Sequence, residues 1–405
     1  NWDDYKGVDL RGKVAVVLVN DPDFEQPELN VFGGRAMTYY GRWTYKYEEL
    51  ARRGAAGVLI VHETAPASYG WNTVKNSWTQ PQFDIVRANA AAERVGMEAW
   101  IQRDDAVELF QRAGLDFEQL KTRARTRDFR PVTLTGATFS ADFAVKAEAT
   151  TSHNVVARLP GTTRANETVL YTAHWDHLGE GLKDANGDGI FNGAVDNATG
   201  TAALIEMARV FAAGPRPQRS VVMMAVTAEE KGLLGSEFYA ANPLYPLETT
   251  VAVLNMDALS VDGAARDFEV VGLGKNDLGD RVVEWARPQG ITVRAESNPE
   301  AGIFYRSDHF PFAKRGVPVL YGGSGRDLVN GGLAAGEAAS RDYVTKRYHQ
   351  PDDEWSATWD WGGALQEIGA LYAIGRDLAN SAAWPKWTPG DEFEAARKAS
   401  DAARR

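Results

Sequence analysis

The sequence predicts an α/β fold built on a mostly parallel central sheet with helices on both faces. Apolar runs of strand length recur along the chain, at 168–171, 220–226, 251–254 and 317–321. Helical segments alternate with them, since residues 201–212 and 366–379 are apolar at helical spacing. This alternation joins parallel strands through crossovers, and the crossover helices then cover both faces of the sheet.

The chain length predicts two domains. A domain usually takes roughly 100–200 residues, and this chain has 405, of which 44% are hydrophobic. We expect a first α/β domain at 1–135, a larger second domain at 136–385, and a polar tail at 386–405 that forms a solvated helix or a frayed end. Residues 128–142 are expected to hold the connector and the first strand of the second domain.

A strand, a helix and a second strand open the chain. Residues 14–19 are β-branched and apolar, residues 47–54 are helical in character with a glycine stop, and residues 55–61 form another apolar run. This pattern resembles the protease-associated domain, a small α/β module inserted in several peptidase families. The aromatic cluster at 39–47 is either a packing patch or a wall of the substrate cleft.

Composition excludes several classes of partner and site. The net charge of −11 and the absence of a basic patch argue against nucleic acid and anionic membranes. No apolar run approaches the ~20 residues that span a bilayer. With no cysteine, metal ligands must be histidine and carboxylate. The chain begins at Asn1 and carries no signal segment, which suggests a processed or truncated form.

Acidic and imidazole side chains gather where predicted strands end. An aspartate after a strand often only caps a helix, but the carboxyl ends of parallel strands meet at one edge of a sheet. Zn²⁺ accepts these donors, and burying several carboxylates without a cation is costly. The seven residues therefore predict a metal site: His174, Asp176, Asp196, Glu229, Glu230, Asp257 and His349.

Six short motifs in order resemble the co-catalytic dizinc aminopeptidases. These belong to the zinc exopeptidases related to glutamate carboxypeptidase and the transferrin receptor, and the likeness spans about 145–383. The resemblance implies a phosphorylase/hydrolase-like fold. The motifs are H-W-D at 174–176, D-N-A-T-G at 196–200, A-E-E-K-G-L-L-G-S at 228–236, N-M-D at 255–257, S-D-H at 307–309 and Y-H-Q-P-D-D at 348–353.

The resemblance implies a role for each residue. Asp196 would bridge two zinc ions, with His174 and Asp257 completing one site. Glu230 and His349 would complete the other. Glu229 would be the general base, and Asp176 would hold the free nitrogen of His174. Two zinc ions share and activate a hydroxide, and three carboxylate ligands nearly cancel their charge.

Other polar residues receive weaker expectations. His177 is not at a ligand position of the pattern, so we expect it to form hydrogen bonds or line the cleft. Asp308 and His309 match a family motif near the active site, and Asp353 is expected to order the loop of His349. The stretch Asp184–Asp188 begins like a calcium loop, but its twelfth position is Val195 where an EF-hand has glutamate.

The leading function is a zinc-dependent exopeptidase that removes amino-terminal residues from peptides. The alternatives are a carboxypeptidase or dipeptidase of the same family, a one-zinc glutaminyl cyclase, and a non-catalytic receptor-like module. A carboxypeptidase would bind the substrate carboxylate, and Arg306, Arg326 and Arg341 are the candidates. An aminopeptidase would bind the substrate amine, and Glu229 and Asp308 are the candidates. The resemblance also implies export to the periplasm or the medium, and it leaves the oligomeric state open.

Overall fold

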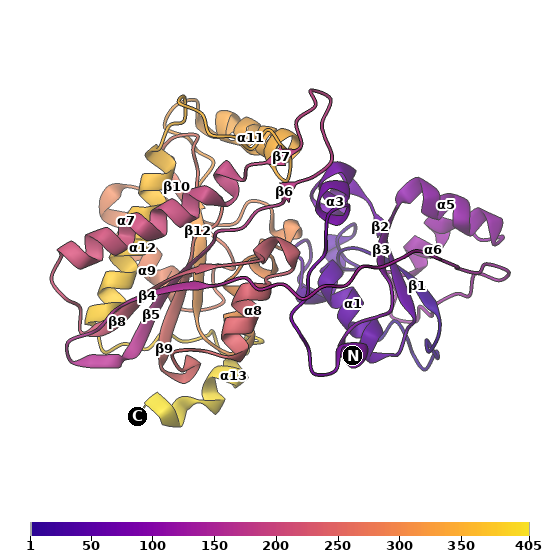
Figure 1. The fold of residues 1–405 in the computed structure, drawn as a ribbon, viewed down its shortest axis with the longest axis horizontal. Coiled ribbons are helices and arrows are strands. Elements are labelled where there is room, and N and C mark those ends of the chain that lie inside the picture. The colour runs from indigo at the N-terminus through magenta and orange to yellow at the C-terminus, as the bar shows by residue number, and fades with distance from the viewer. Residues whose placement is uncertain (1, 405) are drawn as a thin grey trace. The chain divides into compact units, whose positions relative to one another are not determined.

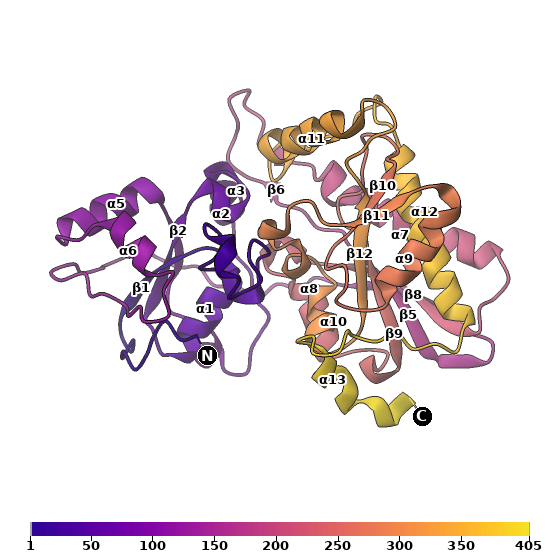
Figure 2. The same cartoon turned by 180° about the vertical axis from the view of Figure 1, so that it is seen from behind.

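A computed structural model describes residues 2–404, and the chain divides into two compact units. Figure 1 and Figure 2 show them from opposite sides. The first unit holds the described residues up to Lys75, Val86–Thr151 and Asn298–Tyr305. The second holds Asn76–Ile85, Ser152–Ser297 and the residues from Arg306 on. Each unit thus includes a short segment from the stretch of chain that mainly forms the other.

The first unit is built on a three-stranded parallel sheet in the order β1-β2-β3. Helices α5 and α6 cover one face and α1 the other (Figures 1 and 2). Apolar residues of α5 and α6 pack with β2 in the core of this unit. Its elements are β1 (Val14–Leu18), α1 (Trp43–Arg52), β2 (Gly57–His62), α2 (Thr64–Ala67), α4 (Ala90–Glu93), β3 (Glu98–Gln102), α5 (Arg103–Arg112) and α6 (Phe117–Arg123), and α3 (Trp71–Trp78) crosses the unit boundary.

The second unit contains a seven-stranded sheet in the order β11-β10-β12-β9-β5-β8-β4. Four of the six strand pairs are parallel; β4 with β8 and β10 with β12 are antiparallel. The predicted α/β fold with a mostly parallel sheet is therefore confirmed. The strands are β4 (Val155–Leu159), β5 (Arg164–His174), β8 (Arg219–Val226), β9 (Thr250–Asn255), β10 (Asp267–Val270), β11 (Thr292–Ala295) and β12 (Val319–Ser324).

Helices cover both faces of this sheet. The apolar sides of α7, α9 and α12 pack with β5 and β9 in the main core, while α8 and α10 lie on the opposite face (Figures 1 and 2). The helices are α7 (Thr199–Ala213), α8 (Leu234–Ala241), α9 (Leu278–Ala286), α10 (Phe310–Lys314), α11 (Gly332–Asp342), α12 (Gly362–Asn380) and α13 (Glu394–Ala399). A two-stranded hairpin, β6 (Gly179–Glu180) with β7 (Ile190–Phe191), stands apart from the sheet.

Two segments differ from the sequence-based expectation. No strand forms within 128–142, where the chain makes turns at 128 and at 135–136 and otherwise has no regular secondary structure. The segment 386–405 was expected to be a solvated tail, but its described residues, 386–404, pack within the second unit. The side chains of Trp387 and Phe393 are buried, and Arg397 donates a hydrogen bond to the carbonyl of Thr250. The two buried aromatic rings and the Arg397 hydrogen bond hold this segment in place.

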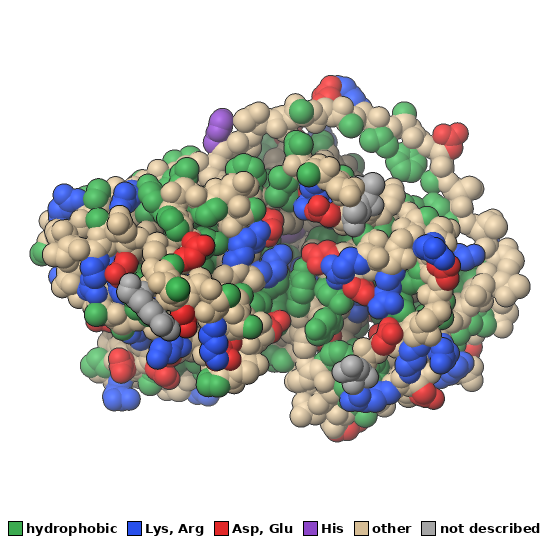
Figure 3. Space-filling view, turned by 90° about the horizontal axis from the view of Figure 1, so that it is seen from below, with side chains coloured by type: hydrophobic (Ala, Val, Ile, Leu, Met, Phe, Trp, Pro, Cys, Tyr) green, Lys and Arg blue, Asp and Glu red, His purple; other side chains and the backbone are tan. Residues whose placement is uncertain are grey.

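Surface charge is mixed on the face shown in Figure 3, where basic and acidic side chains are interspersed. In the part of the chain that the structure describes, no helix combines the length and the apolar character needed to cross a membrane.

Candidate metal centre

The predicted donors lie at one edge of the seven-stranded sheet, beyond three neighbouring parallel strands. His174 is the last residue of β5 and is level with the last residue of β8. The turn Glu229–Lys231 follows β8, and Asp257 follows β9. Asp196 lies in the segment Ala194–Ala198 that precedes α7, where its own backbone is not helical. Parallel strands thus deliver their side chains to one place, as the sequence predicted.

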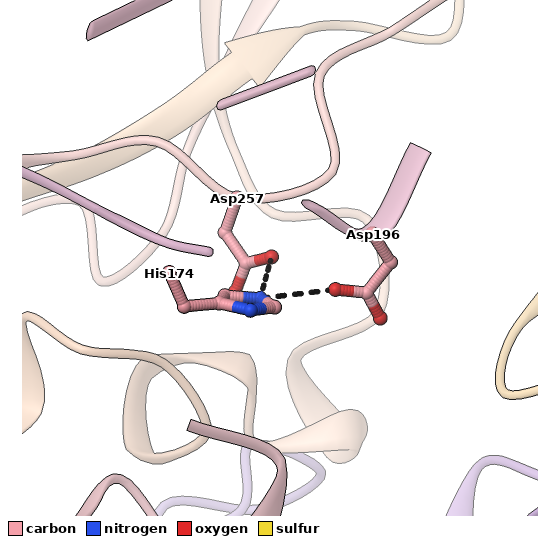
Figure 4. A group of neighbouring side chains, drawn as sticks. All are labelled: His174, Asp196 and Asp257. Atoms are coloured by element: carbon pink, nitrogen blue, oxygen red, sulfur yellow. Dashed lines mark hydrogen bonds and ion pairs between the residues drawn. The ribbon is translucent and has the colours of Figure 1, made fainter. Parts of the chain in front are cut away.

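The first donor group consists of His174, Asp196 and Asp257 (Figure 4). Nε2 of His174 lies 3.0 Å from Oδ1 of Asp196 and 3.3 Å from Oδ1 of Asp257. Its Nδ1 lies 2.9 Å from the carbonyl oxygen of Asp176. A carbonyl can only accept, so Nδ1 carries a proton and Nε2 faces the two carboxylates. Burial lowers the pKa of His174, but Asp257 and the other nearby carboxylates outweigh it and raise the pKa well above its ordinary value. A proton or a metal ion at Nε2 would satisfy the nitrogen and both carboxylates.

The side chain of Asp176 does not hold His174 as expected. The main-chain carbonyl of Asp176, not its carboxylate, holds Nδ1 of His174; Oδ1 lies 3.8 Å away. The carboxylate accepts the backbone N–H groups of Glu229 at 3.1 Å and Glu230 at 3.3 Å. These N–H groups point at the carboxylate because the turn after β8 leaves them without helical partners. Asp176 therefore fixes that turn against the end of β5.

The second donor group consists of Asp196, Glu230 and His349. Nε2 of His349 lies 3.0 Å from Oε2 of Glu230 and 3.6 Å from Oδ2 of Asp196. Asp196 thus faces His174 with one oxygen and His349 with the other. Burial alone raises the pKa of Asp196, but the two imidazoles outweigh it and hold the pKa well below its usual value. The geometry fits a carboxylate that bridges two cations.

The carboxylate of Glu229 adjoins both groups. It offers an oxygen within 4.8 Å of donor atoms of His174 and Glu230. Burial raises the pKa of Glu229 well above its ordinary value, and the charges of Glu230 and Asp257 add to the shift. A carboxyl group that burial favours in its neutral form is suited to holding a proton.

A chain of hydrogen bonds orients Asp257. Oδ2 of Asp257 accepts from the hydroxyl of Ser307 at 2.6 Å. Asn255 donates to Ser307 at 2.7 Å, and Thr172 donates to Asn255 at 2.7 Å. Sequence reasoning placed Ser307 near the site but missed Asn255 and Thr172. Asn255 opens the N-M-D motif, which was the available signal, whereas Thr172 is one of many β-branched residues in its strand.

Asp308 and His309 do not reach the surface of the protein. Both are fully buried. Asp308 accepts a hydrogen bond of 2.6 Å from Ser236, and burial raises its pKa to about 7. The His309 ring packs against Tyr321 with centroids 5.1 Å apart. A fully buried Asp308 has no access to a substrate amine, so the expected role of Asp308 in binding that amine does not fit.

Asp353 acts on a different loop from the one expected. Its carboxylate accepts the backbone N–H groups of Val195 at 3.0 Å and Asp196 at 3.0 Å. It therefore holds the backbone of Asp196. The loop of His349 is fixed from elsewhere: Ser77 Oγ lies 2.9 Å from Nδ1 of His349, and Asn76 donates to its carbonyl at 2.9 Å. No sequence signal linked Asn76 and Ser77 to this histidine.

The other predicted residues lie in three different settings. Arg306 donates a hydrogen bond of 2.8 Å to the hydroxyl of Tyr348, the neighbour of His349. Arg326 and Arg341 face Glu269 and Glu337 at 3.8 and 3.7 Å. The Asp184 carboxylate accepts the backbone N–H groups of Asn186 and Asp188, each at 2.8 Å. Its oxygens already serve the turn of the β6–β7 hairpin, and calcium binding there stays a prediction.

The donors fit zinc by type and by environment. They are imidazoles and carboxylates, which Zn²⁺ prefers, and they are buried or half-buried, so their charges face little solvent. Three sets offer atoms within 4.8 Å of one another: His174 with Asp196 and Asp257, His174 with Glu229 and Glu230, and His177 with Asp196 and Glu230.

Comparison with known proteins gives an independent view of the chain. The sequence profile of peptidase family M28 matches residues 154–373, more than half of the chain. A probable zinc metalloprotease of Leptosphaeria maculans is 30% identical over 128 residues, which are 32% of this chain and 26% of that protein. Aminopeptidase NAALADL1 of Mus musculus is 35% identical over 118 residues, 28% of this chain and 14% of that protein. The matched stretch thus spans about a quarter of these relatives' length or less.

Solved structures include an aminopeptidase from Aneurinibacillus sp. strain AM-1. It is 19% identical, with a TM-score of 0.47, over 93% of this chain and 71% of that chain.

Proposed function

Because the chain belongs to peptidase family M28, we propose that it is a zinc-dependent exopeptidase that releases amino acids from the amino terminus of peptides. The observation that carries the proposal is the carboxylate of Asp196, which presents one oxygen to His174 and the other to His349. A carboxylate shared by two imidazoles in a buried acidic site suits a pair of cations.

The two donor groups would each hold one zinc ion, with Asp196 common to both. When bound, zinc polarises the scissile carbonyl and makes water a good nucleophile at neutral pH. Asp353 fixes the backbone of Asp196, and Ser307 orients Asp257. These contacts hold the donors in place before substrate arrives, so little reorganisation is needed during the reaction.

Glu229 would act as the general base. Its carboxylate accepts the proton released when water attacks the carbonyl carbon, and it returns that proton to the nitrogen of the leaving amine. The carboxylate of Asp176 supports this by holding the backbone N–H of Glu229 at 3.1 Å. The adjacent Glu230 faces His349 instead. The two neighbouring glutamates can therefore serve different roles.

One observation favours a second candidate, a carboxypeptidase or dipeptidase of the same family. Arg306 lies beside Tyr348, which is next to the second donor group, and an arginine there could hold a substrate carboxylate. The full set of five donors and the base argues against a receptor-like module, because a non-catalytic module does not need them. Action on amino termini is supported by the name of the mouse relative, an aminopeptidase.

For the first unit we propose the protease-associated domain, on the basis of its parallel β1-β2-β3 sheet with helices on both faces. The predicted bounds, 1–135 for this domain and 136–385 for the peptidase domain, also remain proposals. Export to the periplasm or the medium remains a prediction from the family resemblance.

The test combines metal analysis with a substrate panel. We expect about two zinc ions per chain and hydrolysis of amino-acid anilides with a free amine. Glu229→Gln should keep its zinc and lose about 10²–10⁴-fold in kcat. The matched control is Glu284→Gln, since Glu284 is exposed on α9. Cleavage of amino-blocked peptides alone would favour the carboxypeptidase, and a zinc-free, inactive protein would refute the exopeptidase.

A further inference from the structure

His177 has no role in the proposed reaction, yet it lies inside the site. It comes three residues after His174, and only 7% of its side chain is exposed. Its Nδ1 lies 2.7 Å from Oε1 of Glu230. The ring meets the ring of His349 nearly at right angles, with centroids 5.7 Å apart. His177 therefore adjoins the second donor group.

The polar atoms of this contact are not satisfied by protein groups. Within residues 2–404, neither ring nitrogen of His177 nor Oε1 of Glu230 has a hydrogen-bond partner. A buried polar atom without a partner costs about 1–3 kcal/mol, so natural proteins keep few of them. Nδ1 and Oε1 are close but not in hydrogen-bonding geometry with each other. Both would be satisfied by one cation that lies between them.

The ring of His177 is packed against the loop that carries Asp196. Gly193 has a positive φ of 60°, and a Cβ there would lie 2.5 Å from Cγ of His177. It would also overlap the carbonyl oxygen of Asp196. Glycine at this position lets the imidazole approach the bridging residue. A ring nitrogen of His177 lies within 4.8 Å of donor atoms of Asp196 and Glu230.

We propose that Nδ1 of His177 is a further ligand of the zinc ion in the second donor group. This inference rests on the proposed function, because it assumes that zinc occupies the site. A neutral imidazole adds a donor without adding negative charge, which suits a site already rich in carboxylate. The second group then holds two imidazoles, whereas the first holds one.

The extra ligand makes the two metal positions unequal. Four protein donors leave the second zinc ion close to the closed coordination of structural sites. Three protein donors leave the first zinc ion with an open position, as catalytic sites require. We therefore expect a chelator to remove the zinc of the first group before that of the second. Water and substrate would therefore bind at the zinc ion of the first donor group.

NMR of the histidine side chains tests directly whether His177 binds the metal. The chain has six histidines, so a protein with isotope-labelled histidine gives a simple spectrum. In the holoenzyme exchanged with NMR-active cadmium, a ligating ring nitrogen shows scalar coupling to the metal. We expect this coupling at Nδ1 of His177 as well as at His174 and His349. Coupling at His174 and His349 without His177 would overturn the inference and leave the proposed function intact. Absence of metal from all three would refute the proposed function itself.

Metal retention supplies a second readout that does not depend on activity. The variant His177→Asn keeps a hydrogen-bonding group where Nδ1 lies but removes the imidazole ligand. In chelator competition, its affinity for the zinc ion of the second donor group should fall at least about 100-fold. Removing a residue that only hydrogen-bonds to a metal ligand lowers affinity by roughly 10–100-fold, so a larger loss indicates direct ligation. His153→Asn removes an exposed histidine and should behave as wild type. Unchanged retention in His177→Asn would mean that His177 only forms hydrogen bonds, which contradicts the inference.

Discussion

The buried carboxyl group of Glu367 should make the stability of the protein depend on pH. Glu367 lies on α12 and is 5% exposed. Its Oε1 accepts the backbone N–H groups of Ser260 at 3.2 Å and Ser324 at 2.8 Å. Burial raises its pKa from 4.5 to about 8. The folded protein therefore keeps this group neutral at a pH where the unfolded chain ionises it.

The sign and the size follow from linkage. Because the folded pKa is raised, the contribution of Glu367 is fully present below its unfolded pKa. It is lost as pH rises through about 8. A shift of this size corresponds to roughly 5 kcal/mol, at about 1.4 kcal/mol per pKa unit. Glu367→Gln keeps an oxygen that accepts both N–H groups and cannot ionise, so its unfolding free energy should lack this slope.

Guanidinium denaturation across the range from about pH 5 to about pH 9 measures the effect. Wild type should lose stability over this range relative to Glu367→Gln, and the two curves should separate most at the alkaline end. Glu284→Gln changes an exposed glutamate of α9 and should follow wild type. Parallel curves for wild type and Glu367→Gln would refute the reasoning, because they would mean that Glu367 is already ionised in the folded protein.

Three further predictions concern packing and the metal centre. Gly375→Ala should destabilise the protein by about 1–3 kcal/mol in thermal denaturation, because its Cβ would overlap the hydroxyl of Tyr171. Gly369→Ala, on the same helix with open space around it, should instead stabilise by about 0.5–1 kcal/mol; equal effects would contradict this. Ser77→Ala removes the partner of Nδ1 of His349 and should weaken zinc binding about 10–100-fold in chelator competition, and an unchanged affinity would exclude a positioning role. Chelation should abolish hydrolysis and added zinc should restore it, whereas activity in metal-free protein would refute a zinc enzyme.

The sequence predicted the parts of the site that depend on strand topology. His174 and Asp257 could be placed together because both follow apolar runs that read as parallel strands, and such strands end at one edge. The same rule brought in the pair Glu229 and Glu230. Alternation of strands and helices also predicted the mostly parallel sheet.

The sequence could not predict contacts that depend on side-chain direction or on distant segments. Whether Asp176 uses its carboxylate or its carbonyl is decided by backbone direction at the end of β5. Ser77 and His349 are far apart in the chain, and a lone serine carries no signal. The segment after residue 385 looked solvated because polar residues surround Trp387 and Phe393, yet two buried aromatic rings outweigh many exposed charges.

The order of the strands in the sheet would make the stability of the folded protein depend on bound zinc. The donors are spread from His174 to His349, and they meet only after β9, β5 and β8 have paired. Such long-range pairing forms slowly, and an unfolded chain offers no comparable cage. Zinc that binds only the folded state adds about 2.7 kcal/mol to stability at a concentration 100-fold above its dissociation constant. Scarce zinc would therefore increase the unfolded fraction that proteases degrade, in addition to slowing turnover.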